Sequence, residues 1–203
     1  MVRIQHPDPD LNNNAQRPPT TDSLVRCLMN ETRELVKFAR DPRDGQDEVT
    51  FRCFEQALIP KVFSIARIAV ALFLTCAEER VRARTPTWVE RAGRTFQKTR
   101  ARLRTLTTWF GPVRYWRTYM LERDVEPGQG HGFYPLDVAL GLTSDRFSLG
   151  LLSVVVRLAT TLSFATAKST AELFLPDVPA THVIEKATLG FGRFTNQWFE
   201  HRP

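Results

Sequence analysis

Two adjoining runs of sequence set the architecture of this chain: Arg100-Ala-Arg-Leu-Arg-Thr-Leu-Thr-Thr-Trp-Phe110 and, after Gly111, Pro112-Val-Arg-Tyr-Trp-Arg-Thr-Tyr-Met-Leu121. Both are rich in Thr, Trp, Tyr and Val, the residues that favour a pleated strand. Because only a Gly-Pro step separates them, they predict an antiparallel β-hairpin. A further strand around residues 94–98 would extend the hairpin to a three-stranded meander, which is more stable than two strands alone.

The hairpin lies within a strongly basic segment. Residues 80–123 hold twelve Arg or Lys against two Glu, whereas the whole chain carries a net charge of +6, so the basicity is local. Cations interleaved with Trp and Tyr suit a strand pair lying along a phosphate backbone, where the rings can stack. The alternative is a solvated hairpin whose aromatic side chains pack on a neighbouring helix. The predicted phosphate ligands are Arg100, Arg102, Arg104, Arg114 and Arg117.

Composition places the chain among globular proteins, with 42% hydrophobic and 25% charged residues in 203. Its three cysteines are widely spaced, form no Cys-x-x-Cys pair and follow no signal peptide, so we expect reduced thiols in a cytoplasmic protein. The four histidines are scattered, and we expect neither a metal nor a cofactor. The apolar run 62–77 is shorter than a bilayer requires and contains Arg67, which favours a core or oligomerisation helix over a membrane span.

The fold class predicted from these patterns is mainly α, with a small antiparallel β-hairpin or three-stranded meander. Five regions are expected along the chain. They are a disordered tail (1–21), a helical region with a long apolar helix (22–84), the basic β-hairpin module (85–123), a linker and apolar clasp (124–147), and a three-helix region resembling a helix-turn-helix (148–203).

Helix starts and stops are marked by short polar side chains and prolines. Pro60 either kinks the long apolar helix or opens a new one, and Thr85-Pro86 ends it. The predicted N-caps are Thr21 or Asp22 for the first helix, Thr50 for the second, Asp145 or Ser148 for the third, and Ser163 for the fourth.

Residues 164–174 and 180–189 have the lengths of two helices joined by a tight turn, as in a helix-turn-helix whose second helix enters the major groove. Generic helical hairpins share this pattern, so the spacing alone is not specific. In the second helix Lys186 is a ligand for phosphate or guanine, whereas Glu185 repels phosphate. The predicted DNA-reading residues are Thr181, His182, Glu185 and Lys186.

Several blocks in one order resemble the N-terminal half of bacterial insertion-sequence transposases of the Kra type, over residues 50–199. The blocks are Phe54-Glu55, the apolar helix ending in Glu79-Arg80, Thr105-Leu-Thr-Thr-Trp-Phe-Gly-Pro-Val-Arg-Tyr-Trp-Arg-Thr-Tyr119, Gly132-Phe-Tyr-Pro-Leu-Asp137, Ala139-Leu-Gly-Leu142, Ser163-Phe164 with Ala167, and Val183-Ile-Glu-Lys186 followed by Leu189-Gly190.

The resemblance implies a region that binds double-stranded DNA at transposon ends, followed in complete members by an RNase H-like catalytic domain. Because the chain ends at Pro203, where that domain would begin, we expect no enzymatic activity and no small-molecule substrate. The implied location is the bacterial cytoplasm, in association with the nucleoid. Two features depart from the family: residues 88–99 lack the Cys pairs of a zinc ribbon, and Ala180 stands where many members have Ser.

Two other interpretations remain open. The chain is either a self-associating module, in which the apolar run 62–77 pairs with a second copy as a homodimer, or a non-functional truncated relic. In the relic, an incomplete fold would expose apolar side chains of the last helix that a missing domain should cover. Those side chains are Phe191, Phe194, Trp198 and Phe199.

Overall fold

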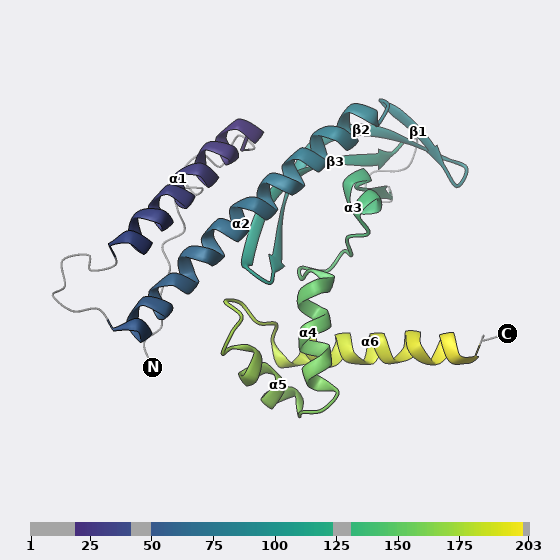
Figure 1. Ribbon diagram of the computed structural model, residues 1–203. Coiled ribbons are helices and arrows are strands. Elements are labelled where there is room, and N and C mark those ends of the chain that lie inside the picture. The colour runs from purple at the N-terminus through teal and green to yellow at the C-terminus, as the bar shows by residue number, and fades with distance from the viewer. Residues whose placement is uncertain (1–18, 42–49, 124–130, 201–203) are drawn as a thin grey trace.

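The computed structural model describes residues 19–41, 50–123 and 131–200, with side chains up to residue 192 (Figure 1). Within these ranges the chain is mainly helical and has one small antiparallel sheet, which confirms the predicted fold class. The elements are α1 (Thr21–Arg40), α2 (Phe51–Arg84), β1 (Trp88–Arg91), β2 (Arg94–Thr108), β3 (Gly111–Glu122), β4 (Gly132–Phe133), α3 (Pro135–Leu140), α4 (Leu149–Ala159), α5 (Phe164–Ala171) and α6 (Thr181–Glu200).

Helices α1 and α2 lie side by side and antiparallel (Figure 1). The N-cap of α1 is Thr20, whose hydroxyl accepts from the Ser23 amide, so the predicted cap at Thr21 or Asp22 is one or two residues too late. The hydroxyl of Thr50 accepts from the Cys53 amide and caps α2, as predicted. Helix α2 runs through Pro60 without interruption, so this proline does not start a new helix.

The sheet is an antiparallel meander in the order β1-β2-β3-β4. The predicted hairpin is present, with Leu106 opposite Val113 and the chain reversing at Trp109 and Phe110. Gly111 follows this turn at φ +105°, a backbone conformation that side-chain-bearing residues rarely adopt. The fourth strand was not predicted: β4 is two residues long and adds to the free edge of β3 near Met120.

The larger core lies where the α1–α2 pair meets the hairpin. Helix α2 runs along β3, and the short helix α3, within the predicted clasp, contacts both elements. A buried carboxylate reinforces this packing, because Glu78 of α2 accepts hydrogen bonds from the amide (2.7 Å) and the hydroxyl of Thr118. The buried core residues are Leu24, Ile68, Ala71, Leu74, Leu106, Val113, Tyr115 and Leu136.

Helices α4, α5 and α6 pack around a second, separate core that includes Leu151, Val155 and Ile184. Ser148 caps α4 and Ser163 caps α5 through hydrogen bonds from the Leu151 and Thr166 amides, so Ser148 rather than Asp145 is the cap of the third predicted helix. The three-helix region is therefore present within the described residues of the predicted range 148–203. Helix α5 ends at Ala171, so the segment 172–180 that joins it to α6 is longer than the predicted tight turn of a helix-turn-helix.

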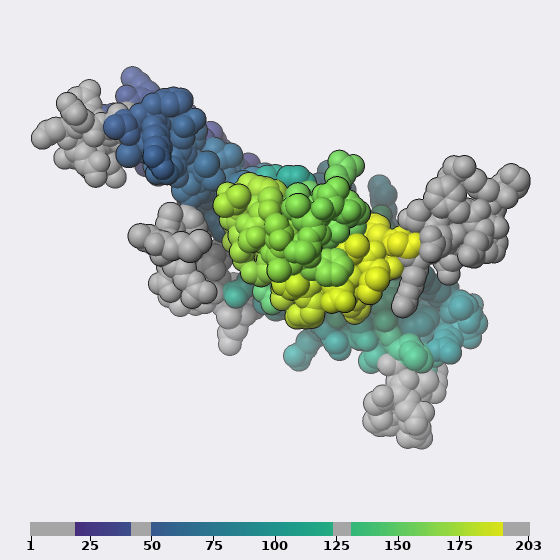
Figure 2. Space-filling model, turned by 90° about the horizontal axis from the view of Figure 1, so that it is seen from below, coloured from purple at the N-terminus to yellow at the C-terminus, as the bar shows by residue number. Residues whose placement is uncertain are grey.

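One residue of the hairpin joins the two cores. The Thr107 amide donates to the Arg146 carbonyl (2.8 Å), and the Ser148 amide donates to the Thr107 carbonyl (2.9 Å). Phe147 thereby forms a parallel bridge to β2 immediately before α4 begins. Figure 2 shows the α4–α6 unit, green to yellow, standing in front of the teal sheet when the molecule is seen from below.

Two predictions fall largely outside the described residues. The predicted disordered tail is described only from residue 19 onward, where it leads directly into α1. Of the C-terminal apolar side chains, Phe194, Trp198 and Phe199 are beyond the described side chains, while Phe191 is 41% exposed.

Replacing Ser148 by Ala should lower the free energy of unfolding by about 1 kcal/mol, because the Leu151 amide at the start of α4 loses its acceptor. Urea denaturation followed by circular dichroism measures this change. Ser144→Ala is the matched control, since Ser144 is exposed and makes no side-chain hydrogen bond within the described residues. Equal stabilities of the two variants would contradict the assigned cap.

Candidate nucleic-acid interface

The five predicted hairpin arginines divide into two classes by burial. Arg100, Arg102 and Arg114 are exposed. The guanidinium-bearing side chains of Arg104 and Arg117 retain only 6% and 13% exposure. Only the side chains of the first class are exposed at the surface, where a phosphate backbone would lie.

Arg104 and Arg117 are held by one carboxylate, that of Asp137 in α3. Arg104 Nη1 lies 3.0 Å from Asp137 Oδ2, and Arg117 Nη1 contacts the same oxygen. Arg104 also donates to the carbonyls of Thr143 and Asp145, the latter at 2.6 Å. These two predicted phosphate ligands are therefore buried and already paired with a carboxylate distant in sequence, which places them in the interior of the fold and not on an open surface.

Burial has an electrostatic consequence for the groups around Asp137. Desolvation lowers the pKa of Arg117, and the nearby charge of Arg104 lowers it further. The guanidinium of Arg117 also lies 3.3 Å from the ring centroid of Tyr134, a cation–π contact in the same cluster. Burial likewise raises the pKa of Tyr115, which lies opposite Arg104 in the register.

Other cations of the basic segment are also explained by the fold. Lys98 donates to the carbonyls of Arg82 (2.7 Å) and Thr85 (2.8 Å), and so satisfies the C-terminal end of α2. Arg94 pairs with Glu122 at 3.4 Å across β2 and β3. Aromatic rings cover further guanidinium groups: Arg91 lies over Phe133, Arg102 over Tyr119 and Arg123 over Trp88.

The sheet separates the exposed arginines into two places. Arg102 is paired with Arg117 and Arg114 with Thr105, and these two positions lie an odd number of residues apart along β2. Because side chains alternate between the faces of a sheet, Arg102 and Arg114 project from opposite faces. One ligand lying on a single face of the hairpin cannot contact both.

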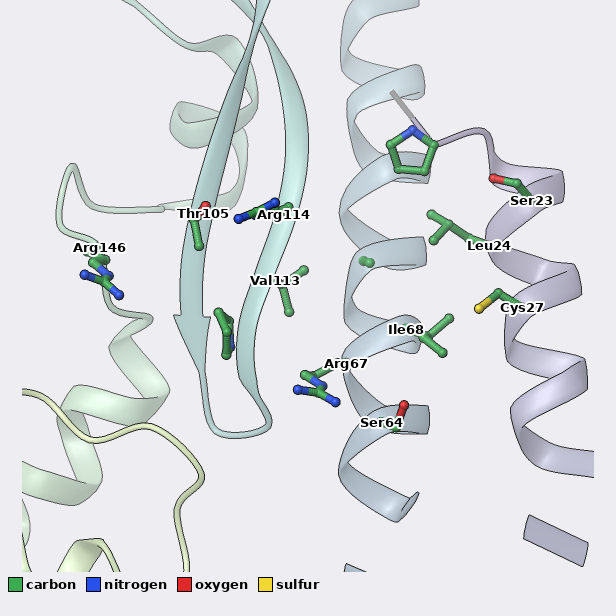
Figure 3. Close-up of a pocket in the computed structure, with 13 residues that line it drawn as sticks. Ser23, Leu24, Cys27, Ser64, Arg67, Ile68, Thr105, Val113, Arg114 and Arg146 are labelled. Atoms are coloured by element: carbon green, nitrogen blue, oxygen red, sulfur yellow. The ribbon is translucent and has the colours of Figure 1, made fainter. Parts of the chain in front are cut away.

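A cleft of 640 Å³ opens between the hairpin and the α1–α2 pair, and Arg114 is among the residues that line it. Arg67 of α2, Arg114 of β3 and Arg146 of the segment before α4 line it, and Thr105 lies beside Arg114 (Figure 3). No Asp or Glu is among its described lining residues. Its floor is apolar, formed in part by Ile68 and Val113, so the charge that borders this cleft is positive.

Arg146 also lines a second groove, of 730 Å³, between α4 and α6. This groove contains His182 and Lys186 from the first turns of α6, with one carboxylate, that of Asp145. Two of the predicted DNA-reading residues, His182 and Lys186, thus line a groove that shares Arg146 with the cleft of Arg114. We call the line of Arg67, Arg114, Arg146, His182 and Lys186 the basic path.

The remaining predicted residues of α6 are placed less favourably. Thr181 is only half-exposed at the start of the helix. Glu185 is exposed beside His182 and Lys186, and all three line one further concavity. The carboxylate of Glu185 repels a phosphate at this point, as the sequence indicates.

Two residues of the basic path were missed by sequence reasoning. In the sequence Arg67 is only a charge that argues against a membrane span, and Arg146 lies outside the segment 80–123. Arg67 did carry a signal, since it is the single charged residue in the apolar run 62–77. No sequence pattern indicates that Arg146 would reach the hairpin, because its position depends on the bridge to Thr107.

The described residues contain no group of three His, Cys, Asp or Glu placed to hold a metal ion, and all three cysteines are free thiols. No protein-family model, curated protein or solved structure matches this chain. The transposase resemblance therefore rests on the sequence blocks alone.

Replacing Asp137 by Asn should lower the free energy of unfolding by about 3–5 kcal/mol, because two buried guanidinium groups lose their counter-charge. Chemical denaturation measures the effect. Asp145→Asn is the control: Arg104 contacts only the backbone carbonyl of Asp145, so this exposed side chain can change at little cost. A decrease below about 1 kcal/mol in Asp137→Asn would contradict the central role of this carboxylate.

Proposed function

We propose that this chain is a non-catalytic DNA-binding region of an insertion-sequence transposase, and that it binds duplex DNA along the basic path. The observation that supports this function best is the position of Arg146, which borders both the cleft of Arg67 and Arg114 and the groove of His182 and Lys186. Arg146 thereby links cations from the hairpin and α2 to those of α6, as contact with successive phosphates requires.

Each part of the path has a chemical role in this proposal. Arg67, Arg114 and Arg146 bind backbone phosphates, because guanidinium groups match the geometry of phosphate oxygens. Lys186 extends the phosphate contact or reaches the O6 and N7 atoms of a guanine in the major groove. His182 and Thr181 lie beside Lys186 as hydrogen-bonding groups, so any base reading comes from the start of α6.

Arg100 and Arg102 take a secondary role. They are exposed on β2, and Arg102 stacks on Tyr119 with its guanidinium 3.9 Å from the ring centroid. Since Arg102 projects from the face opposite to Arg114, Arg102 contacts the same DNA only if the duplex bends around the hairpin or a second segment binds there.

The assignment to transposon ends and the absence of strand cleavage come from the resemblance, in which the catalytic carboxylates belong to a following domain. Within this proposal the chain supplies affinity and positioning and performs no chemistry on the DNA. Its partner is double-stranded DNA, and its location is the bacterial nucleoid.

The triple variant Arg114→Ala, Arg146→Ala, Lys186→Ala should bind a mixed-sequence duplex more weakly than the unmodified chain. Its dependence of log affinity on log salt should be less steep by about 0.9 for each phosphate that the variant no longer neutralises. Fluorescence anisotropy across a salt series from about 50 to 200 mM measures both quantities. The matched control is Arg33→Ala with Arg40→Ala, two exposed cations of α1 outside the path.

The control should leave the affinity and salt slope unchanged. A double variant Arg100→Ala, Arg102→Ala tests the arginines of β2 and should weaken binding less than the triple variant does. If it weakens binding more than the triple variant does, the basic path is not the interface. Comparing insertion-sequence termini with the mixed duplex tests the transposon-end assignment, which equal affinities would contradict.

A further inference from the structure

Helix α2 combines high hydropathy with little burial. By length and composition alone it could cross a membrane, since its most apolar 18-residue window has a mean hydropathy of 2.0, yet only 17% of that window is buried inside the protein. One side of α2 packs on α1 and the sheet, and this side carries the charged residues Glu78 and Arg67. The exposed apolar surface therefore belongs to the other side of α2.

The exposed residues of α2 form one stripe. Ile59, Val62 and Phe73 are 54%, 44% and 59% exposed, which is unusual for such large apolar side chains. Ala69 is exposed and Ala66 half-exposed between them. The intervals between positions 59, 62, 66, 69 and 73 alternate between three and four residues, the spacing by which one helix presents a continuous contact line to another. We call these five residues the α2 stripe.

Helix α1 adds a parallel row on the same side of the helix pair. Val25, Met29 and Val36 are 38%, 58% and 52% exposed and share one face of α1. At 3.6 residues per turn, this row lies about half a turn from Leu24 and Cys27, which line the cleft facing the hairpin. The α2 stripe lies about half a turn from the cleft-lining residues of α2 in the same way. Both rows thus face away from the hairpin.

The α2 stripe is complementary to itself when two copies run antiparallel. In the register that places residue 62 opposite residue 73, Val62 meets Phe73 of the second copy and Ala66 meets Ala69. The same register brings Ile59 to Cys76 and Glu55 to Arg80. Large side chains then face large ones toward the ends, and two pairs of alanines let the helices approach closely at the two-fold axis.

The ends of the stripe carry the charge complementarity. Glu55 and Arg80 are exposed, and neither makes a hydrogen bond or ion pair within the described residues. In the antiparallel register they form two symmetry-related ion pairs that flank the apolar contact. A parallel pair would instead place Glu55 beside Glu55 and Arg80 beside Arg80, which is repulsive.

We propose that two copies of this chain associate through the α1–α2 face into an antiparallel four-helix bundle, with residue 62 of one α2 opposite residue 73 of the other. From residue 55 to residue 80 the contact extends about 38 Å along the helix. The rows of α1 add apolar area beside the α2 contact, as in an isologous dimer. This inference is independent of the proposed DNA binding, because the basic path lies on the opposite side of the α1–α2 pair.

Disulfide trapping tests the register. In a chain with Cys27, Cys53 and Cys76 replaced by Ser, Val62→Cys and Phe73→Cys are made as separate proteins, mixed, and oxidised. The antiparallel register predicts a covalent heterodimer in the mixture and no covalent homodimer of either protein alone, because residue 62 is about 16 Å along the helix from its own counterpart. Covalent homodimers of each single variant would indicate a parallel pair and overturn the register.

Charge exchange tests the same contact without oxidation. The mass of the unmodified chain in solution, measured by light scattering after size-exclusion chromatography, should be twice the 23.3 kDa of one copy. Glu55→Arg should weaken the dimer, and Glu55→Arg combined with Arg80→Glu should restore it. Phe73→Asp should give a monomer with unchanged circular dichroism, since its side chain is exposed.

The proposal would be overturned by a mass of 23.3 kDa at every protein concentration up to about 100 times a dimer Kd of about 1 μM. A monomer that sediments with phospholipid vesicles would overturn it as well. None of these experiments contains DNA. A failure here therefore leaves the basic path untouched, and a failure of DNA binding leaves the dimer untouched.

Discussion

The carboxylate of Asp137 is the contact on which the central part of this protein depends. It lies in a helix of six residues and pairs with two arginines from neighbouring strands, while Arg104 also donates to the carbonyls of Thr143 and Asp145. A buried ion pair of this kind is costly to break, because either partner alone would be a desolvated charge. Arg146 follows directly after Asp145, whose carbonyl is held by the buried Arg104. Arg104 therefore fixes the backbone position from which the exposed Arg146 of the basic path extends.

Polar contacts of this type connect parts of the elongated molecule that share no apolar core. The larger apolar core joins α2 to the hairpin, whereas the core of the α4–α6 unit is separate, so hydrogen bonds at defined points link that unit to the hairpin. Glu78 with Thr118 joins α2 to β3, and Thr107 joins β2 to α4. Each of these contacts specifies one arrangement, because an unpaired buried donor or acceptor would be penalised.

The elements of this fold were largely predictable, since they depend on local patterns: the hairpin from its β-favouring runs, and α2, α4 and α5 from caps at Thr50, Ser148 and Ser163. Strand β4 was not, because two residues carry no periodicity and their pairing depends on a long-range partner. The site was predictable only as charge. Nothing in the order Arg102, Arg104, Arg114, Arg117 shows that two of the four meet Asp137, since that contact is made by tertiary packing.

The backbone of Thr107 sets how the α4–α6 unit is placed relative to the hairpin. Two backbone hydrogen bonds of Thr107 attach the α4–α6 unit, which carries Lys186, to the hairpin, which carries Arg114. The distance between the backbone at Arg114 and the backbone at Lys186 is therefore set by main-chain geometry and not by flexible side chains. A ligand whose charges are spaced differently must therefore deform itself, and a duplex that bends easily would be favoured over a stiff one of equal charge.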